Sequence, residues 1–213
     1  MCGEPVRDIT NITPIVTGIS GGGAILAFSI RVSQWQDYFG ADDVFTGLAL
    51  AVAIPMGALE FVMSNEGFGK DIWTIPFSKI YRIVKFTWMT EVLYMACMAW
   101  TKMAFLCLYL RIFPSKQLRK IIYAMLGVCT AYWIAFVIAT IFNCTPLPYI
   151  WTSWDGEHTG KCFNFHIFAW AHAGVNIALD LIVVGMPFPE LLKLSLSGKN
   201  KFYILVMFSF GLL

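Results

Sequence analysis

Long hydrophobic stretches separated by short polar linkers dominate the pattern of this chain. Lipid offers no hydrogen-bond partner to a peptide group, so a segment that crosses a bilayer forms a helix of about 20 apolar residues. The expected spans run over about 13–32, 41–63, 88–113, 121–142 and 163–186, with a shorter stretch at 202–213. The pattern predicts an all-α fold, a polytopic transmembrane helix bundle.

The polar N-terminal residues and the linkers indicate how the chain is divided. Residues 1–12 are polar and are expected to form an N-terminal stub, whereas residues 13–213 form one membrane domain. The amphipathic stretch 77–84 precedes the third span and is expected to lie in the membrane interface. The sixth stretch has about 12 residues where a crossing needs roughly 20, so we expect a fragment that stops inside its sixth span.

Composition supports the membrane interpretation. Hydrophobic residues make up 58% of the 213 residues and charged residues 13%, against about 25% charged in soluble domains. The net charge of +2 is too small to suggest nucleic acid as a partner. Membrane lipid is the partner that this composition indicates.

The distribution of Lys and Arg predicts the orientation, because these residues stay cytosolic in short linkers. The linkers after spans one, three and five carry eight of them: Arg31, Arg111, Lys116, Arg119, Lys120, Lys193, Lys199 and Lys201. The other side carries six: Arg7, Lys70, Lys79, Arg82, Lys85 and Lys161. Cys144 and Cys162 share an interhelical loop, and a disulfide there requires an oxidising compartment. We expect a multi-pass plasma-membrane protein with its N-terminus outside.

Two ionisable side chains lie well inside the expected spans: Lys102 in the third and Asp180 in the fifth. Each costs about 2.5 to 3.5 kcal/mol on insertion scales and needs a partner or a wet cavity. Lys102 and Asp180 lie about 14 and 17 positions past the starts of spans three and five, which run in the same direction. The two side chains are therefore expected at similar depths in the membrane. Glu91 shares a face with Lys102, and His172 and Asn176 share one with Asp180. We expect the two stripes to line a partly polar cavity that opens outward.

Several roles are open for this polar set. A structural ion pair that locks two helices together is one, and a ligand or proton site is another. A retinal Schiff base at Lys102 with Asp180 as counter-ion is a third, but a lysine on the third helix is the wrong place for known retinal proteins. The loop between Cys144 and Cys162 carries Trp151 and Trp154, which suit either a lid over a ligand vestibule or interfacial anchors.

Catalytic and metal-binding patterns are missing from the sequence. It contains no HExxH motif. Ser20 lies in the glycine-rich stretch from Gly18 to Gly23, where the letters fit GxSxG, but this stretch is inside an expected span and does not follow a strand, so no serine nucleophile is predicted. His166 and His172 point about 120° apart on a helix, which is unsuitable for shared metal ligation. We expect no metal, no cofactor and no enzymatic activity.

The side expected to be cytosolic carries candidate coupling residues. Asp42 and Asp43 open the second span, where acidic side chains suit the free amides and the positive end of the helix dipole. A basic linker follows the third span. The candidate set is Asp42, Asp43, Arg111, Lys116, Arg119 and Lys120.

The order of several short motifs resembles one family. They are Asp42-Asp43, Gly67-Phe68-Gly69 with Trp73, Lys102 with Leu108-Tyr109-Leu110-Arg111-Ile112-Phe113, Cys144-Thr145-Pro146 with Trp151, Gly160-Lys161-Cys162, Asp180, and Pro187-Phe188-Pro189 with Leu191 and Leu194. Together they resemble the fungal rhodopsin-domain membrane proteins. The resemblance implies a seven-helix, rhodopsin-like architecture, here truncated in the sixth helix. "Rhodopsin" in that family describes the architecture and not a bound retinal.

The resemblance also implies a function. Some members carry a cysteine-rich CFEM domain before the first helix, and Cys2-Gly3-Glu4-Pro5 resembles the tail of one. The resemblance implies a G-protein-coupled-receptor-like role for a few members and an unknown role for most. On that basis we expect a receptor-like protein that senses an unknown extracellular ligand, with a heterotrimeric G protein as its partner. Lys70-Asp71 departs from the basic residue and histidine of many members. The alternatives are a transporter or channel with a polar path between spans three and five, and a nonfunctional truncated gene product.

Overall fold

The computed structural model describes residues 10, 12–33 and 40–193. The CFEM-like tail at Cys2 and the expected sixth span at 202–213 lie outside the described residues. The long helices are α1 (Ile12–Ser33), α2 (Ala41–Glu66), α3 (Phe77–Ile112), α4 (Lys116–Ile141) and α6 (Phe165–Gly185). The short elements are a 3-10 helix (Ile72–Thr74), β1 (Cys144–Thr145), α5 (Tyr149–Thr152), β2 (Lys161–Cys162) and α7 (Phe188–Lys193).

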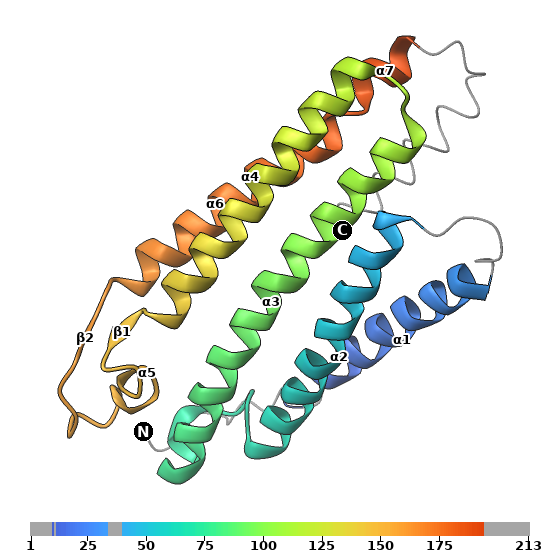
Figure 1. The fold of residues 1–213 in the computed structure, drawn as a ribbon. Helices are drawn as coiled ribbons and strands as arrows, with labels where there is room; N and C mark the ends of the chain where they lie inside the picture. The colour runs from blue at the N-terminus through green and yellow to red at the C-terminus, as the bar shows by residue number, and fades with distance from the viewer. Residues whose placement is uncertain (1–9, 11, 34–39, 194–213) are drawn as a thin grey trace.

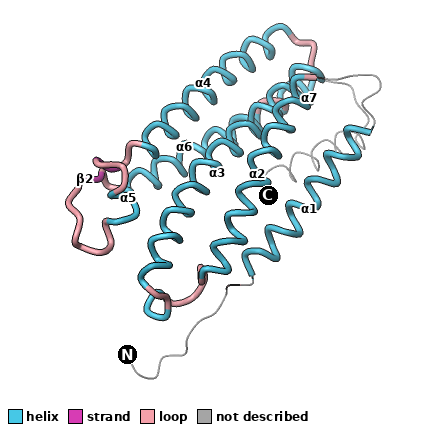
Figure 2. Tube along the Cα trace, turned by 60° about the horizontal axis from the view of Figure 1, so that its bottom comes forward, coloured by secondary structure: helices cyan, strands magenta, loops and turns pink. Residues whose placement is uncertain are grey.

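Successive long helices run in opposite directions, because short connections keep sequence neighbours antiparallel. Figure 1 shows α1, α2, α3 and α4 following one another across the bundle, with α6 beside α4. The tube in Figure 2 shows the same order from another side. Strands β1 and β2 pair antiparallel, with Cys144 opposite Cys162, at one end of the bundle. This is called the disulfide end below, and the end where α3 meets α4 is called the opposite end.

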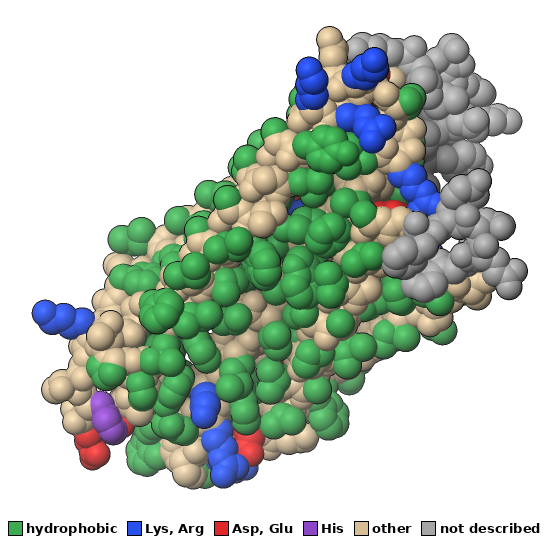
Figure 3. All heavy atoms as spheres, in the orientation of Figure 1, with side chains coloured by type: hydrophobic (Ala, Val, Ile, Leu, Met, Phe, Trp, Pro, Cys, Tyr) green, Lys and Arg blue, Asp and Glu red, His purple; other side chains and the backbone are tan. Residues whose placement is uncertain are grey.

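The predicted membrane bundle is confirmed as a set of long apolar helices. In the described part of the chain, five helices are long and apolar enough to cross a membrane. Many of their large hydrophobic side chains face outward, such as Ile19 and Trp170 at 74% and 80% exposed. Figure 3 shows hydrophobic side chains covering the middle of the visible face, with Lys and Arg gathered towards its ends. Lipid chains suit such a surface, and water does not. The seven-helix count stays a prediction.

Helix α3 corrects one expected boundary. The stretch 77–84 was expected as a separate interfacial segment, but it forms the first turns of α3, which has 36 residues. The helix starts directly after Pro76 and contains neither Gly nor Pro that would interrupt it. At 1.5 Å per residue it is about 54 Å long, well beyond a hydrocarbon core of about 30 Å. Its first turns therefore extend past the apolar part of the bundle at the disulfide end.

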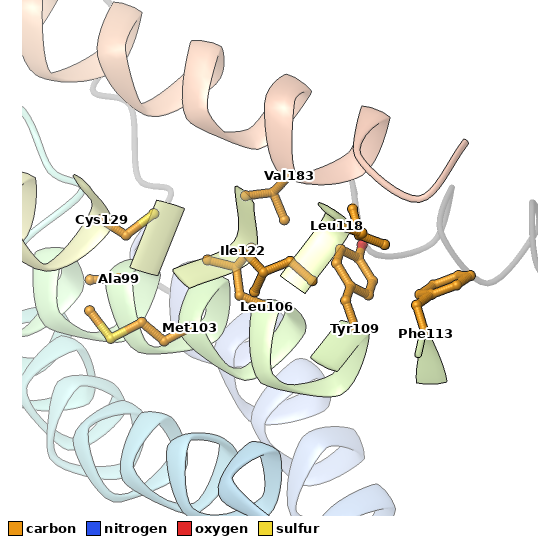
Figure 4. Packing of buried hydrophobic residues seen from close by; sticks show 9 residues of the cluster. All are labelled: Ala99, Met103, Leu106, Tyr109, Phe113, Leu118, Ile122, Cys129 and Val183. Atoms are coloured by element: carbon orange, nitrogen blue, oxygen red, sulfur yellow. The ribbon is translucent and has the colours of Figure 1, made fainter. Parts of the chain in front are cut away.

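A buried cluster joins α3, α4 and α6. Leu106 of α3 and Ile122 of α4 have no exposed surface, and Val183 of α6 is 3% exposed. Figure 4 shows the nine clustered residues on facing surfaces: Ala99, Met103, Leu106, Tyr109, Phe113, Leu118, Ile122, Cys129 and Val183. The cluster lies in the half of α3 nearer the opposite end, so it determines how α3 faces α4 and α6 there.

Adjacent isoleucines on α4 test this packing. Ile122→Ala is expected to lower the free energy of unfolding by about 2 kcal/mol, the low end for buried aliphatic truncations, because lipid also solvates apolar helices and mainly packing is lost. Ile121→Ala is the matched control, since Ile121 is 53% exposed, and we expect a change within about 0.5 kcal/mol. Denaturant titration of the folded protein in mixed micelles measures both, and equal losses would contradict the role of the cluster.

Candidate functional site in the helix bundle

Lys102 of α3 is buried and contacts two polar side chains of α6. Its Nζ lies 2.9 Å from Asp180 Oδ1 and donates to Asn176 Oδ1 at 2.8 Å. The Lys102 side chain is 5% exposed and that of Asp180 is 35% exposed. The pairing expected from the matched depths is therefore present, and Asn176 supplies a second acceptor for the ammonium group.

Asn176 also connects the two charged residues. Its Nδ2 donates to Asp180 Oδ2 at 3.4 Å, across one turn of α6. Each oxygen of Asp180 thus has a partner, and the Asn176 amide uses both of its ends. Buried charges are tolerated where pairing is completed by hydrogen bonds in this way. The three side chains form a single polar connection between α3 and α6.

His172 and Glu91 take no part in this connection. Among the described residues, the two predicted stripes therefore meet only through Lys102, Asn176 and Asp180. The His172 ring stacks on Tyr132 at 5.6 Å between centroids and lies 5.1 Å from the Phe136 ring, both on α4. Glu91 lies 11 residues before Lys102 on α3, which is about 16 Å along the axis. It lines a pocket at the disulfide end together with Asn143. The expectation of one outward-opening cavity lined by both stripes is wrong in this respect, because α4 packs against the His172 turn.

The predicted Cys144–Cys162 disulfide is confirmed. The loop that it closes packs onto the start of α3 through aromatic rings. Trp151 is buried and lies 5.9 Å from Trp88 and 6.5 Å from Tyr81, and Trp154 stacks on Phe77 at 5.7 Å. The tryptophans therefore hold the loop as a cap on the start of α3.

The exposed tip of this cap carries one perturbed acid. Desolvation raises the pKa of Asp155, but hydrogen bonds from the Glu157 amide and from His158 hold that pKa below its usual value. His158 Nδ1 lies 3.0 Å from Asp155 Oδ2. Because the folded pKa is lowered, this local contact is present above the unfolded pKa of Asp155 and is lost as the pH falls through the folded pKa.

Two arginines and two aspartates gather at the opposite end. Arg31 at the end of α1 pairs with Asp42 and, at 2.5 Å from its Nε, with Asp43. Arg111 at the end of α3 lies 3.4 Å from Asp42 and 3.7 Å from Asp43. Both aspartates are buried, at 3% and 2% exposed. The cluster ties three helices together at their ends.

The aspartates therefore do more than the sequence predicted. Asp43 does accept from the Gly40 amide at 3.1 Å, as expected for a residue at a helix start. Its main contacts, however, are with the arginines. In the sequence, Arg31 was used only to predict the topology. A basic residue at the end of one helix and two acidic residues at the start of the next could have predicted these ion pairs. Lys116, Arg119 and Lys120 are exposed on the first turns of α4 and make none of the cluster's ion pairs.

Sequence reasoning also missed polar residues. Glu60 lies within the second span, where it accepts from Thr17 Oγ1 of α1 at 2.5 Å. Asn143, just past α4, is buried at the disulfide end. The acidic type of Glu60 inside an apolar stretch was a usable signal. Asn143 was marked in the sequence only as the first residue of the glycosylation sequon Asn143-Cys144-Thr145, and not as a buried side chain. In the described part of the chain no three His, Cys, Asp or Glu side chains gather as metal ligands would.

A double-variant experiment tests the Lys102 contact. Asp180→Leu alone leaves the buried ammonium group short of a partner and is expected to lower the free energy of unfolding by about 1 to 3 kcal/mol. Lys102→Met combined with Asp180→Leu removes both charges and is expected to recover most of that loss. Denaturant titration of the unmodified protein, of the Lys102→Met and Asp180→Leu single variants and of the double variant gives the coupling energy. Additive losses in the double variant would show that the contact contributes nothing to stability.

Comparisons with known proteins agree on one relationship. A family model described as the fungal rhodopsin domain matches residues 27–213. The chain is similar to a SAT4 family membrane protein of Emericella nidulans, 28% identical over 152 residues that cover 70% of this chain and 39% of that protein. It is also similar to satratoxin biosynthesis SC1 cluster protein 4 of Stachybotrys chartarum, 29% identical over 112 residues that cover 52% and 41% of the two chains.

A third relative is the polyenoic acids biosynthesis gene cluster protein Ba17b of Metarhizium anisopliae, 26% identical over 111 residues that cover 52% of this chain and 30% of that protein. The chain spans less than half the length of each of these relatives. No solved structure matches it.

Proposed function

The chain belongs to the fungal rhodopsin domain family, and from that premise we propose that it acts as a receptor-like membrane protein that senses an extracellular cue. The proposal places the N-terminus and the disulfide end outside the plasma membrane and the opposite end in the cytosol. The role is one of signal transmission and not of catalysis. A heterotrimeric G protein is the proposed partner on the cytosolic side.

The observation that carries the proposal is the polar contact of Lys102 with Asp180 and Asn176 in the middle of the bundle. A charged pair between two membrane helices is stable in one relative position and is weakened when either helix shifts. Such a contact suits a lock with two arrangements, which is what transmission between distant sites requires. The lock is proposed to hold α3 and α6 in the resting arrangement.

The course of α3 supports this reading. The helix contacts the disulfide-linked cap through Trp88, contains Lys102 in its second half and reaches the aspartate cluster through Arg111. A displacement at its first turns would therefore act on both later contacts. The exposed basic residues at the start of α4, Lys116, Arg119 and Lys120, adjoin the end of α3 and are proposed as part of the coupling surface.

The main rival is a transporter or channel, in which the same pair would lie on a permeation path. The observation that favours it is the partial exposure of Asp180, 35% in its side chain. Ion or solute flux across proteoliposomes that contain the full-length protein would support the rival and exclude the receptor role for this pair.

Basal signalling tests the lock. Full-length protein in which Asp180→Asn or Lys102→Met weakens the contact is expected to raise basal output of a G-protein reporter in yeast about fivefold or more, a typical size for coupling between sites. The exchanged pair, Lys102→Asp with Asp180→Lys, is expected to bring the output back towards that of the unmodified protein. Lys161→Met removes an exposed positive charge at the disulfide end, away from the pair and from the coupling surface, and serves as the charge-matched control.

A second measurement on the same variants also tests the lock. Hydrogen exchange of the linker between α3 and α4 is expected to increase in the two single variants, because the ends of α3 lose their fixed position. Unchanged output together with unchanged exchange in correctly inserted protein would remove the lock from the proposal.

A further inference from the structure

A cavity of about 390 Å³ lies at the disulfide end. It is bounded by the early turns of α3, by the strands that carry the disulfide and by α5, the elements that Figure 1 shows gathered at this end. Its lining includes Trp88, Glu91, Asn143, Cys144, Cys162 and Phe165. The volume falls in the range of about 300 to 1,000 Å³ that is usual for small-molecule sites. The cavity is separate from the Lys102 contact.

Asn143 presents an acceptor that nothing in the described part of the chain satisfies. The residue is 8% exposed, and its side-chain Oδ1 is buried without a hydrogen-bond partner. Its main-chain oxygen accepts from the Phe163 amide at 3.2 Å, so the backbone position is well defined. An unpaired buried acceptor costs free energy in a folded protein. A ligand that donates a hydrogen bond to Oδ1 would remove that cost.

Glu91 adds a carboxyl group to the same cavity. The side chain is half-buried, and the described part of the chain supplies no hydrogen bond or ion pair to it. The other lining residues contain no Lys or Arg. A carboxylate in a mainly apolar pocket without a basic neighbour is stabilised by a cation from outside the chain.

Aromatic rings complete the chemistry. Trp88 and Phe165 line the cavity, and Trp88 packs against Trp151. The Nζ of Lys85 lies 5.3 Å from the centre of a Trp151 ring, so this group of rings already accommodates one ammonium ion. Aromatic faces attract organic cations, above all when water is excluded. The cavity therefore combines two acceptors with apolar walls.

We propose that this cavity binds a compact organic ammonium ion, with Glu91 paired to the cation, Asn143 Oδ1 accepting an N–H, and Trp88 and Phe165 packed on the apolar body. The site rests on the proposed function, since it would receive the cue of that receptor. The disulfide between β1 and β2 holds Cys144, the neighbour of Asn143, in place and so fixes the backbone of Asn143 beside the cavity.

Three probes that share a 2-phenylethyl group and differ in its polar substituent test the chemistry. Full-length protein in lipid nanodiscs is titrated calorimetrically with 2-phenylethylamine, 2-phenylethanol and 3-phenylpropanoate, and heats from empty nanodiscs are subtracted. The amine is expected to bind saturably, and the alcohol and the carboxylate at least about tenfold more weakly, because neither supplies a cation for Glu91. Equal binding of all three probes, or none of the amine, would overturn the proposal.

Variants then locate the binding. Glu91→Gln and Asn143→Leu are each expected to weaken amine binding about tenfold or more, whereas Glu157→Gln, an exposed carboxyl on the same cap, leaves it unchanged. An intact Cys144–Cys162 bond in each variant, shown by mass spectrometry without reductant, verifies that the cap is folded. Undiminished amine binding by folded Glu91→Gln protein would overturn the assignment.

The site and the receptor role fail separately. Amine binding that depends on Glu91, together with unchanged reporter output and unchanged hydrogen exchange in the Lys102 and Asp180 variants, would keep the site and remove the lock that carries the receptor role. Raised reporter output in those variants without amine binding would overturn the site and keep the receptor role.

Discussion

Lipid does not solvate an ammonium group, and Lys102 is therefore stable in the middle of the bundle because α6 presents Asp180 and Asn176 to it. The need of Lys102 for partners on α6 determines more than the ion pair itself. It determines which face of α3 turns towards α6, and the apolar cluster around Leu106 and Val183 packs on that same side. Removing Asp180 leaves the Lys102 ammonium group buried without its counter-ion, so the position of α3 depends on α6.

Contacts at both ends of the bundle complete this arrangement. At the disulfide end, aromatic rings of the cap hold the first turns of α3, and the cystine keeps the cap closed. At the opposite end, Arg31 and Arg111 share two buried aspartates. Helix α3 takes part at all three levels, which gives it the position from which a change at one end can reach the other. The receptor role proposed for this family member draws on that continuity.

The ammonium site and the charged lock have different electrostatic characters. Lys102 carries its own counter-ion, so it presents little net charge to the rest of the bundle. Glu91, about three turns away along α3, has no counter-ion in the described part of the chain and faces a cavity with apolar walls. The Asp180 carboxyl group thus pairs with Lys102, whereas the Glu91 carboxyl group is available to a ligand. The difference follows from the neighbours that each group faces.

Sequence patterns were enough to predict the membrane bundle, the approximate spans, the disulfide and the match in depth between Lys102 and Asp180. The spans and depths depend on hydrophobic length and helical rise, and the disulfide on two cysteines in one loop, all of which are local properties. Only the tertiary structure decided that His172 stacks on Tyr132, that Arg31 and Arg111 share Asp42 and Asp43, and that Asn143 joins Glu91 in a cavity. Periodicity places residues on a common face of one helix, but the rotation of that helix and the neighbour that it meets come from packing between segments distant in the chain.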